Sequence, residues 1–367
     1  MSSIVVDPWP AGDPALLAPS AEHEELRAIV RSLLERAGGT EGVRGVLDGD
    51  LGYSTDLWTR LHRELEVSSM VVPETLGGAG FALADVAVVL EEAGAVLRPE
   101  PLLASSVLAA AALGAADDPD AIAGELRGVM AGELVGTLAL AVEGLEVVDG
   151  RASGVLHRVL AGATAHLVVL GDDRGLWLLD TAGDGVEVRA LEVLDETRRQ
   201  ADLVLTGAAV TALVGVSGAA AAWSRLRRAA AVGVAAEHVG MMARLLDDTV
   251  AYVSTREQFG RKIGSFQAVK HRLADVLVDL ERSRSAVAYA AALHDADPAD
   301  ELAAAVAASV ATDAVVRTVH EAVQLHGGIG FTWEHPAHLY VKRALGDEGL
   351  FGSAAAHRRR IADLVGL

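Results

Sequence analysis

The sequence of 367 residues contains no cysteine, which excludes disulfide bonds, thiolate catalysis and cysteine-ligated metal centres. It is also short of positive charge, with 31 Lys and Arg residues against 51 Asp and Glu residues and a formal net charge of −20. Nucleic-acid binding needs a basic face to meet phosphates, so this balance argues against DNA or RNA as a partner. The twelve histidines are scattered without metal-ligand spacing, and we expect no metal site.

Long apolar runs are missing as well, although 51% of the residues are hydrophobic. The Ala-rich stretches are interrupted by Arg, Glu, His and Asp, and no uninterrupted run is long enough to span a bilayer. The first residues, MSSIVVDPWPAGDP, lack a basic region followed by an apolar one, as a secretion signal would have. These features predict a cytoplasmic protein with no membrane partner.

Composition along the chain predicts an arm and three domains. The Pro- and Ala-rich residues 1–20 read as a loose arm, and residues 21–127 as an N-terminal α-helical domain. Within that domain Glu22–Ala37 carries an apolar stripe at helical spacing, Val72–Phe81 is a Pro- and Gly-rich loop, and Leu83–Val96 is helical again.

Residues 128–212 have a different sequence pattern, which predicts a small antiparallel β domain. Short apolar runs alternate with turn signals such as Asp149-Gly150. The predicted strands are Val135–Val142, Leu167–Leu170, Leu176–Leu179 and Ala201–Leu205.

Residues 213–367 predict a C-terminal helical bundle domain. Trp223–Ser254, Gln267–His294 and Ala299–Leu325 are each longer than an ordinary helix, and their short connections favour a four-helix bundle. The predicted class is therefore α+β, mostly α.

Two segments carry the most specific patterns. Arg256 to Gln267 read REQFGRKIGSFQ, and Gln324 to Phe331 read QLHGGIGF. An arginine offers a planar fork that suits a diphosphate, and adjacent glycines let the backbone approach a ligand closely. The plainer interpretations are a surface Arg after a helix end, a core Phe, and a glycine C-cap after Leu325. His326, which lies between Gln324 and the glycine pair of the second segment, is more consistent with a structural role than with acid–base work.

Both segments, and the order of an α domain, a β domain and a long-helix bundle, resemble the acyl-CoA dehydrogenase family over nearly the whole chain. The resemblance implies an acyl-CoA dehydrogenase-like fold and an FAD-dependent α,β-dehydrogenation of an acyl-CoA thioester. It implies an acyl-CoA substrate, an electron-transfer flavoprotein as electron acceptor, and a role in lipid or steroid catabolism such as β-oxidation. The residues it assigns to a neighbouring subunit's FAD are Arg256, Gln258, Phe259, Gln267, Gln324, Gly327 and Gly328.

The residues for the chemistry are absent from their expected places. In the family a carboxylate removes the α-proton of the substrate, and its usual position falls here on Phe351. Glu348 and Asp347 lie three or four residues away, and Glu348 is only a weak candidate for a base. An alternative position on the first bundle helix falls in residues 227–231, which hold no carboxylate. The flavin-binding loop of the middle domain is replaced by Leu138–Glu146, LALAVEGLE.

The residues that this chain shares with the family are thus those that contact a neighbouring subunit's FAD. The residues that it lacks are those that, in the family, hold a subunit's own FAD and act on the substrate. This division resembles the base-lacking subunit of actinobacterial heteromeric (α2β2) acyl-CoA dehydrogenases. Arg225, Arg227 and Arg228 could meet CoA phosphates, but a solvated helix face explains them better.

Three hypotheses follow from the sequence. The first is a subunit that completes a partner's flavin site. The second is a self-sufficient homotetramer that uses Glu348, Asp347 or another acid as base. The third is a non-catalytic acyl-CoA-binding or scaffold subunit. A fatty, a branched and a steroid side-chain acyl group are all compatible with the sequence.

Overall fold

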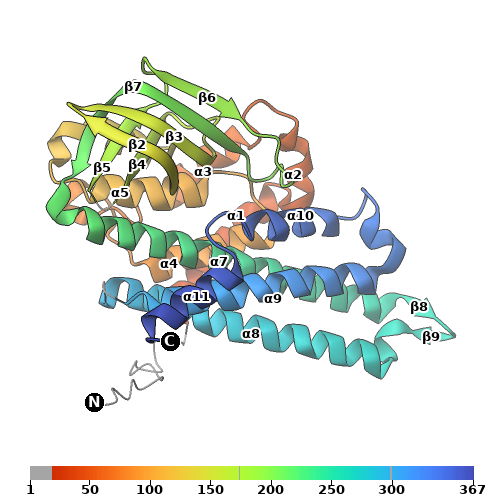
Figure 1. Cartoon of the computed structure of the whole chain (residues 1–367). Helices are drawn as coiled ribbons and strands as arrows, with labels where there is room; N and C mark the ends of the chain where they lie inside the picture. Colours follow the sequence, from red (N-terminus) through yellow and green to blue (C-terminus); the bar gives the residue numbers. More distant parts are fainter. Residues whose placement is uncertain (1–18, 173, 298–299) are drawn as a thin grey trace, which may run out of the picture.

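The computed structural model describes residues 19–172, 174–297 and 300–367, so the predicted arm lies outside the described residues except for Pro19 and Ser20. Helices fill the first part of the chain (Figure 1). Hydroxyl side chains set two of their starts, because Ser20 Oγ accepts from the His23 N–H and Ser54 Oγ from the Leu57 N–H. The elements are α1 (Ala21–Arg36), α2 (Gly39–Leu47), α3 (Thr55–Leu65), α4 (Leu83–Ala95), the π-helix η3 (Leu102–Ala109), α5 (Ala110–Gly114) and α6 (Ala123–Met130).

A seven-stranded sheet follows, with the order β1-β4-β5-β7-β3-β2 and with β6 paired to β7. Its strands are β1 (Gly136–Leu138), β2 (Ala141–Val148), β3 (Arg151–Leu160), β4 (Leu167–Asp172), β5 (Gly175–Asp180), β6 (Val186–Ala190) and β7 (Gln200–Val214). The long β7 connects the β1-β4-β5 part of the sheet to the β3-β2 part by pairing with β5 and β3, and it also pairs with β6. The prediction of a wholly antiparallel sheet is wrong at one pair, since β1 and β4 run parallel.

The rest of the chain is helical and forms the bundle. Its elements are α7 (Val216–Thr255), the hairpin strands β8 (Glu257–Gln258) and β9 (Arg261–Lys262), α8 (Gln267–Ala296), α9 (Leu302–His326), the 3-10 turn η6 (Gly327–Phe331), α10 (Ala337–Asp347) and α11 (Ala354–Leu364). Two of these helical stretches are long and apolar enough to cross a membrane by composition, but 78% and 67% of their most apolar windows are buried inside the protein. They are core helices.

Glycines allow α4 and α7 to cross in direct backbone contact. A Cβ at Gly240 of α7 would lie 1.8 Å from the backbone oxygen of Glu91, and one at Gly94 of α4 would lie 2.3 Å from the backbone oxygen of Glu237. Only glycine fits two helices this close. The crossing joins the N-terminal helices and the bundle in one hydrophobic core.

The predicted α+β architecture, with helices at both ends of the chain and a β unit between them, is confirmed. The sequence-based domain boundaries remain a proposal. The boundary after residue 127 falls inside α6, and the boundary after residue 212 falls near the end of β7.

Candidate functional site

A short hairpin, β8–β9, projects from the bundle between α7 and α8 (Figure 1). Phe259 and Gly260 form the two-residue turn with φ values of 54° and 72°. Positive φ at both positions is the geometry of a type I′ turn, which favours Asn and Gly and is strained for a bulky residue such as Phe. The Phe259 side chain is nevertheless 91% exposed. A strained, exposed aromatic ring at a tip is suited to contact with another molecule.

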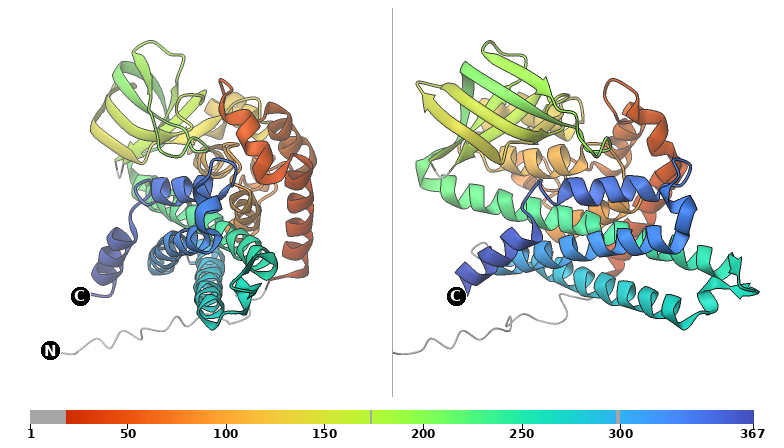
Figure 2. Two further views of the ribbon diagram at one scale, coloured as in Figure 1. Left: turned by 90° about the vertical axis from the view of Figure 1, so that its right-hand side faces the viewer. Right: turned by 45° about the vertical axis from the view of Figure 1, so that its right-hand side comes forward.

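The end of α9 lies at the same end of the bundle as this hairpin (Figure 2). Gly327 ends α9 with φ 63°, and its N–H donates to the carbonyls of Val323 and Gln324. Apart from the adjoining residues, no described residue has an atom within 4 Å of a Cβ built on Gly327 or Gly328. The glycines therefore cap the helix and at the same time leave the backbone open to a ligand, so the two interpretations hold together.

The structure gathers all the predicted cofactor-binding residues here. Arg256 is the C-cap residue of α7, Gln267 is the first residue of α8, and Gln324 lies in the last turn of α9. The ring of Tyr252 stacks on that of His326 with centroids 4.6 Å apart, which fixes the end of α7 against the end of α9. The predicted residues are all exposed: Arg256, Gln258, Phe259, Gln267, Gln324, Gly327 and Gly328.

His326 is buried, and its Nδ1 lies 2.7 Å from the Ala322 carbonyl oxygen, as expected for a structural side chain. Around it the surface carries exposed aromatic rings and basic side chains, together with the exposed carboxylates of Glu257 and Glu334. Phe331 and Trp333 are 84% and 64% exposed. The chain has only three lysines, at positions 262, 270 and 342; the first two flank the start of α8, and the ammonium of Lys342 lies 5.5 Å from the Trp333 ring centroid. This end of an acidic protein is suited to an anionic ligand.

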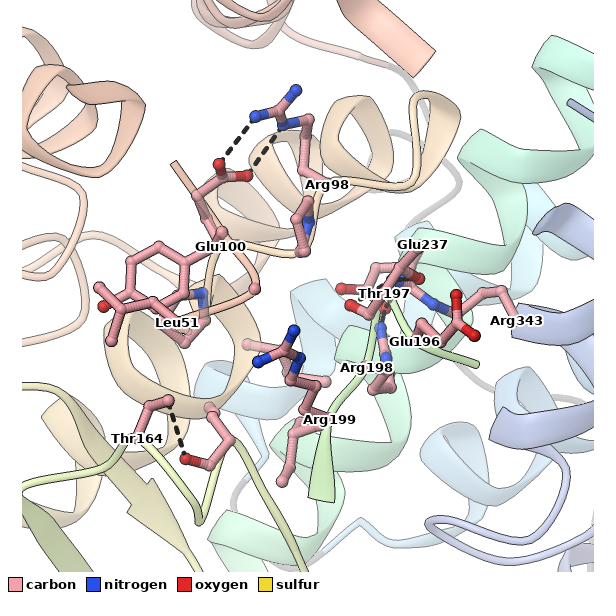
Figure 3. Close-up of a pocket in the computed structure, with 18 residues that line it drawn as sticks. Leu51, Arg98, Glu100, Thr164, Glu196, Thr197, Arg198, Arg199, Glu237 and Arg343 are labelled. Atoms are coloured by element: carbon pink, nitrogen blue, oxygen red, sulfur yellow. Dashed lines mark hydrogen bonds and ion pairs between the residues drawn. The ribbon is translucent and has the colours of Figure 1, made fainter. Parts of the chain in front are cut away.

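The junction between the middle sheet and the bundle is closed. It contains a cavity of only about 40 Å³, drawn in Figure 3. Its lining comes from the start of η3, from the β3–β4 connection, from the segment that leads into β7, and from α7 and α10. A buried bidentate ion pair closes one side, with Arg98 Nη2 2.7 Å from Glu100 Oε1 and Arg98 Nε 2.8 Å from Glu100 Oε2.

Buried charges fill the rest of this junction. Arg198 forms ion pairs with Glu237 of α7 and, at 3.2 Å, with Asp347 of α10. Burial lowers the pKa of Arg198 to about 10, so the guanidinium stays charged at neutral pH. Burial alone would raise the pKa of Asp347, but the charge of Arg198 and a hydrogen bond from His238 hold it below its usual value. Asp347 is therefore held in its charged form by its partners and is not suited to accept a proton as a catalytic base.

A second pair continues this network. Arg343 Nε lies 2.5 Å from Asp195 Oδ2, and Arg343 Nη2 donates to Thr197 Oγ1 at 2.5 Å. All three residues are buried. Because Asp195 and Thr197 precede β7 while Arg343 lies on α10, these contacts fix the β unit to the bundle.

The expected position of a catalytic base holds no usable carboxylate. Phe351 is half-buried and packs against the main core. Glu348 is exposed at the end of α10. Ser353 Oγ accepts from the Ala356 N–H at 3.2 Å and starts α11 as an N-cap. Glu237 was not singled out from the sequence, where the only signal for it is a carboxylate within the apolar run AAAVGVAAEHVG.

The segment Leu138–Glu146 is occupied by secondary structure. Leu138 ends β1, and Ala141 already begins β2. Leu138 and Ala139 are buried and apolar, so the first part of this segment packs inward and offers no side-chain donors to a flavin.

Comparisons with known proteins agree over most of the chain. Residues 217–366 match the family described as acyl-CoA dehydrogenase, C-terminal domain. The chain is 37% identical over 344 residues to the acyl-CoA dehydrogenase IpdE2 of Mycolicibacterium smegmatis, covering 93% of this chain and 98% of that protein.

Two further relatives differ in organisation. The acyl-CoA dehydrogenase FadE34 of Mycobacterium tuberculosis is 38% identical over 355 residues, which is 94% of this chain but 48% of FadE34, so this chain spans about half of that protein. A chain in the crystal structure of the ChsE4-ChsE5 complex from M. tuberculosis superposes with a TM-score of 0.88 at 29% identity, covering 95% of this chain and 98% of that one.

Proposed function

Because this chain belongs to the acyl-CoA dehydrogenase family, we propose that it is the subunit of a heteromeric enzyme that completes the flavin site of a homologous partner. The family are oxidoreductases that act on CH–CH bonds. FAD supplies the acceptor for the hydride that leaves the substrate.

The exposed end of the bundle fits the diphosphate and adenosine side of such a cofactor. The guanidinium of Arg256 makes no hydrogen bond or ion pair with any described residue, so its fork is available to a diphosphate. Gly327 and Gly328 leave open space for close approach, and Phe259 offers a flat apolar surface. We infer that Gln258, Gln267 and Gln324 donate further hydrogen bonds to the same ligand.

The closed junction does not fit a flavin with an acyl thioester. Sites for ligands of that size enclose roughly 300–1,000 Å³, whereas this junction encloses about 40 Å³. Opening it would separate the buried pairs of Arg198 and Arg343 from their carboxylates, which costs several kcal/mol per ion. This contrast between an exposed binding surface and a filled junction of the middle sheet with the bundle is the observation that carries the proposal.

The chemistry divides between the two subunits accordingly. This chain binds and orients the cofactor from outside, and its exposed Phe331 and Trp333 exclude water from the shared site. The partner supplies the base, because Phe351 cannot accept a proton and Asp347 is fixed by Arg198. FadE34 is about twice as long as this chain, and the ChsE4-ChsE5 structure holds two proteins. Both relatives favour an arrangement in which this chain works together with a second homologous unit.

We further infer an acyl-CoA substrate in lipid or steroid catabolism, with an electron-transfer flavoprotein as electron acceptor, in the cytoplasm. The two helices that are long and apolar enough to cross a membrane are mostly buried inside the protein.

Turnover tests this proposal against a homotetramer that uses Glu348. The isolated chain and its complex with a co-expressed homologous partner are assayed with a range of acyl-CoAs and an artificial electron acceptor, each with and without Glu348→Gln. We expect turnover only in the complex and no effect of the substitution, since general-base catalysis contributes about 10²–10⁴ in rate and must come from the partner. Turnover by the isolated chain that is lost on Glu348→Gln would overturn the proposal and restore the homotetramer.

A further inference from the structure

Trp333 presents a large ring on the surface next to the proposed flavin-binding residues. It lies in the connection between η6 and α10, five residues after Gly328. This connection is at the same end of the protein as the β8–β9 hairpin (Figure 1). A fully enclosed tryptophan buries about 150–250 Å², so an exposure of 64% leaves about 100–160 Å² of Trp333 in water in the isolated chain.

Trp333 is exposed but held in place by its neighbours. Its ring stacks on that of His338 on α10, with the centroids 4.7 Å apart and an interplanar angle of 27°. His338 Nδ1 in turn donates to the carbonyl oxygen of His335 at 2.7 Å, and the His335 ring centroid lies 4.4 Å from that of the buried His326. These contacts link the exposed indole to the end of α9. A side chain that is already ordered loses little conformational entropy when a partner covers it.

Two cations flank the same ring. The guanidinium of Arg44 on α2 lies 5.8 Å from the ring centroid, and the ammonium of Lys342 on α10 lies 5.5 Å from it. Lys342 also pairs with Glu196 at 3.8 Å, whereas the Arg44 guanidinium forms no hydrogen bond or ion pair with any described residue. Glu41 and Glu334 are near in the sequence and exposed, but neither pairs with these cations. A carboxylate from outside this chain would therefore find an arginine without an acidic partner.

Exposed aromatic rings are concentrated at this end of the protein. The exposed large hydrophobic side chains of the described residues include one tryptophan and three phenylalanines, Trp333, Phe81, Phe259 and Phe331. All but Phe81 lie at the hairpin tip or after the end of α9. Phe81 lines a cavity at the start of the 40-residue helix α7, and the hairpin follows the end of that helix. Aromatic side chains and arginine are enriched where two proteins meet, so this grouping indicates a protein partner.

We propose that Trp333 is the main anchor of the interface between this chain and its homologous partner subunit. The indole enters an apolar recess of the partner, and a carboxylate at the rim of that recess pairs with Arg44. Buried tryptophan and arginine side chains dominate the affinity of many interfaces. The inference rests on the proposed function, because it places the partner on the surface that also completes the partner's flavin site. A second copy of this chain and the adenine of the cofactor are the other possible occupants, and the experiment separates them.

The dissociation constant of the two subunits is measured by sedimentation, with deflavinated proteins and again with FAD present. We expect Trp333→Ala to weaken association about 10- to 100-fold under both conditions. Phe81→Ala, which removes a ring that is 51% exposed at the other end of the protein, is the matched control and should change the constant less than about threefold.

A charge reversal keeps the test decisive if Trp333→Ala fails to fold, which thermal unfolding of the isolated chain reports. Arg44→Glu should weaken association about tenfold, and more strongly at low salt. Arg359→Glu on α11 reverses an exposed charge that has no ion-pair partner among the described residues, and we expect it to associate as the wild type does.

The outcomes that contradict the inference differ from those that contradict the proposed function. Equal association of Trp333→Ala and Phe81→Ala would overturn the inference. A defect seen only with FAD, or wild-type subunits that associate only with FAD, would assign the ring to the cofactor. Dimerisation of the isolated chain that is lost in Trp333→Ala would assign it to a second copy. Wild-type subunits that do not associate even with FAD would refute the proposed function as well.

Discussion

Arg256→Ala should weaken FAD binding to the heteromeric complex without changing the stability of the isolated chain. Arg256 is exposed, and its guanidinium makes no ion pair or hydrogen bond with any described residue. Removing it therefore leaves no buried group unsatisfied, and the free energy of unfolding should change by less than about 0.5 kcal/mol. A loss of FAD affinity larger than this change in stability must therefore come from a contact that Arg256 makes outside this chain.

The size of the effect follows from the contact that we propose. A hydrogen bond between a guanidinium and a diphosphate is charge-assisted and contributes about 1.5–3 kcal/mol. This range corresponds to a loss of roughly 10- to 150-fold in affinity for FAD. Arg256→Lys keeps the charge but loses the planar fork, so its loss should be intermediate.

FAD is titrated into the deflavinated complex, and thermal unfolding of the isolated chain is measured in parallel. Arg359→Ala on α11, which is also exposed and whose guanidinium makes no hydrogen bond or ion pair with the described residues, is the control for a change of surface charge. An FAD affinity in Arg256→Ala equal to that of Arg359→Ala would refute the placement of the diphosphate at this surface. A loss of stability in the isolated chain would show that Arg256 has a structural role.

Further predictions concern the interior. Glu237→Gln removes a buried partner of Arg198 and should lower the free energy of unfolding in urea by about 3 kcal/mol; no loss would mean that the pair contributes little. Gly240→Ala should destabilise by about 1–3 kcal/mol or more, because its Cβ would lie 1.8 Å from a backbone oxygen of α4, whereas Gly124→Ala, with open space around it, should be neutral or stabilising. The pKa of His294 is about 4 in the folded chain against 6.5 unfolded, so its contribution of about 3 kcal/mol is present above pH 6.5 and is lost as the pH falls toward 4. His294→Gln should flatten the pH dependence of stability in this window, and an unchanged profile would contradict the assignment.

The long helices were predictable because their patterns are local. The Ala-rich segments of the bundle favour helix over many turns, and α8 begins at Gln267 as expected and ends within two residues of the prediction. The strand β3 was missed because Gly154, His157 and Arg158 interrupt its apolar residues. The strand β6 was missed because most of its side chains are exposed, which leaves no apolar run to detect.

The candidate site was only partly accessible from the sequence. The proposed flavin-binding residues lie in two short segments, and each pattern can be recognised from a few consecutive residues. Their roles remain proposals. The buried network was not predictable, because Asp195 and Arg343 are 148 positions apart and only folding brings them together. Arg228 was misread for the same reason. A charged residue next to two other arginines suggests a solvated face, whereas Arg228 is 5% exposed and its Nη1 donates to the carbonyl oxygen of Asp300, 72 positions away.

Flavin stoichiometry in the purified complex tests the central claim most directly. The isolated chain and its complex with the homologous partner are purified, and bound FAD is released and quantified per polypeptide. A chain whose own junction is closed should carry no FAD when isolated, and the complex should carry one FAD for each pair of subunits. One FAD per polypeptide in the complex, or FAD retained by the isolated chain, would contradict this account.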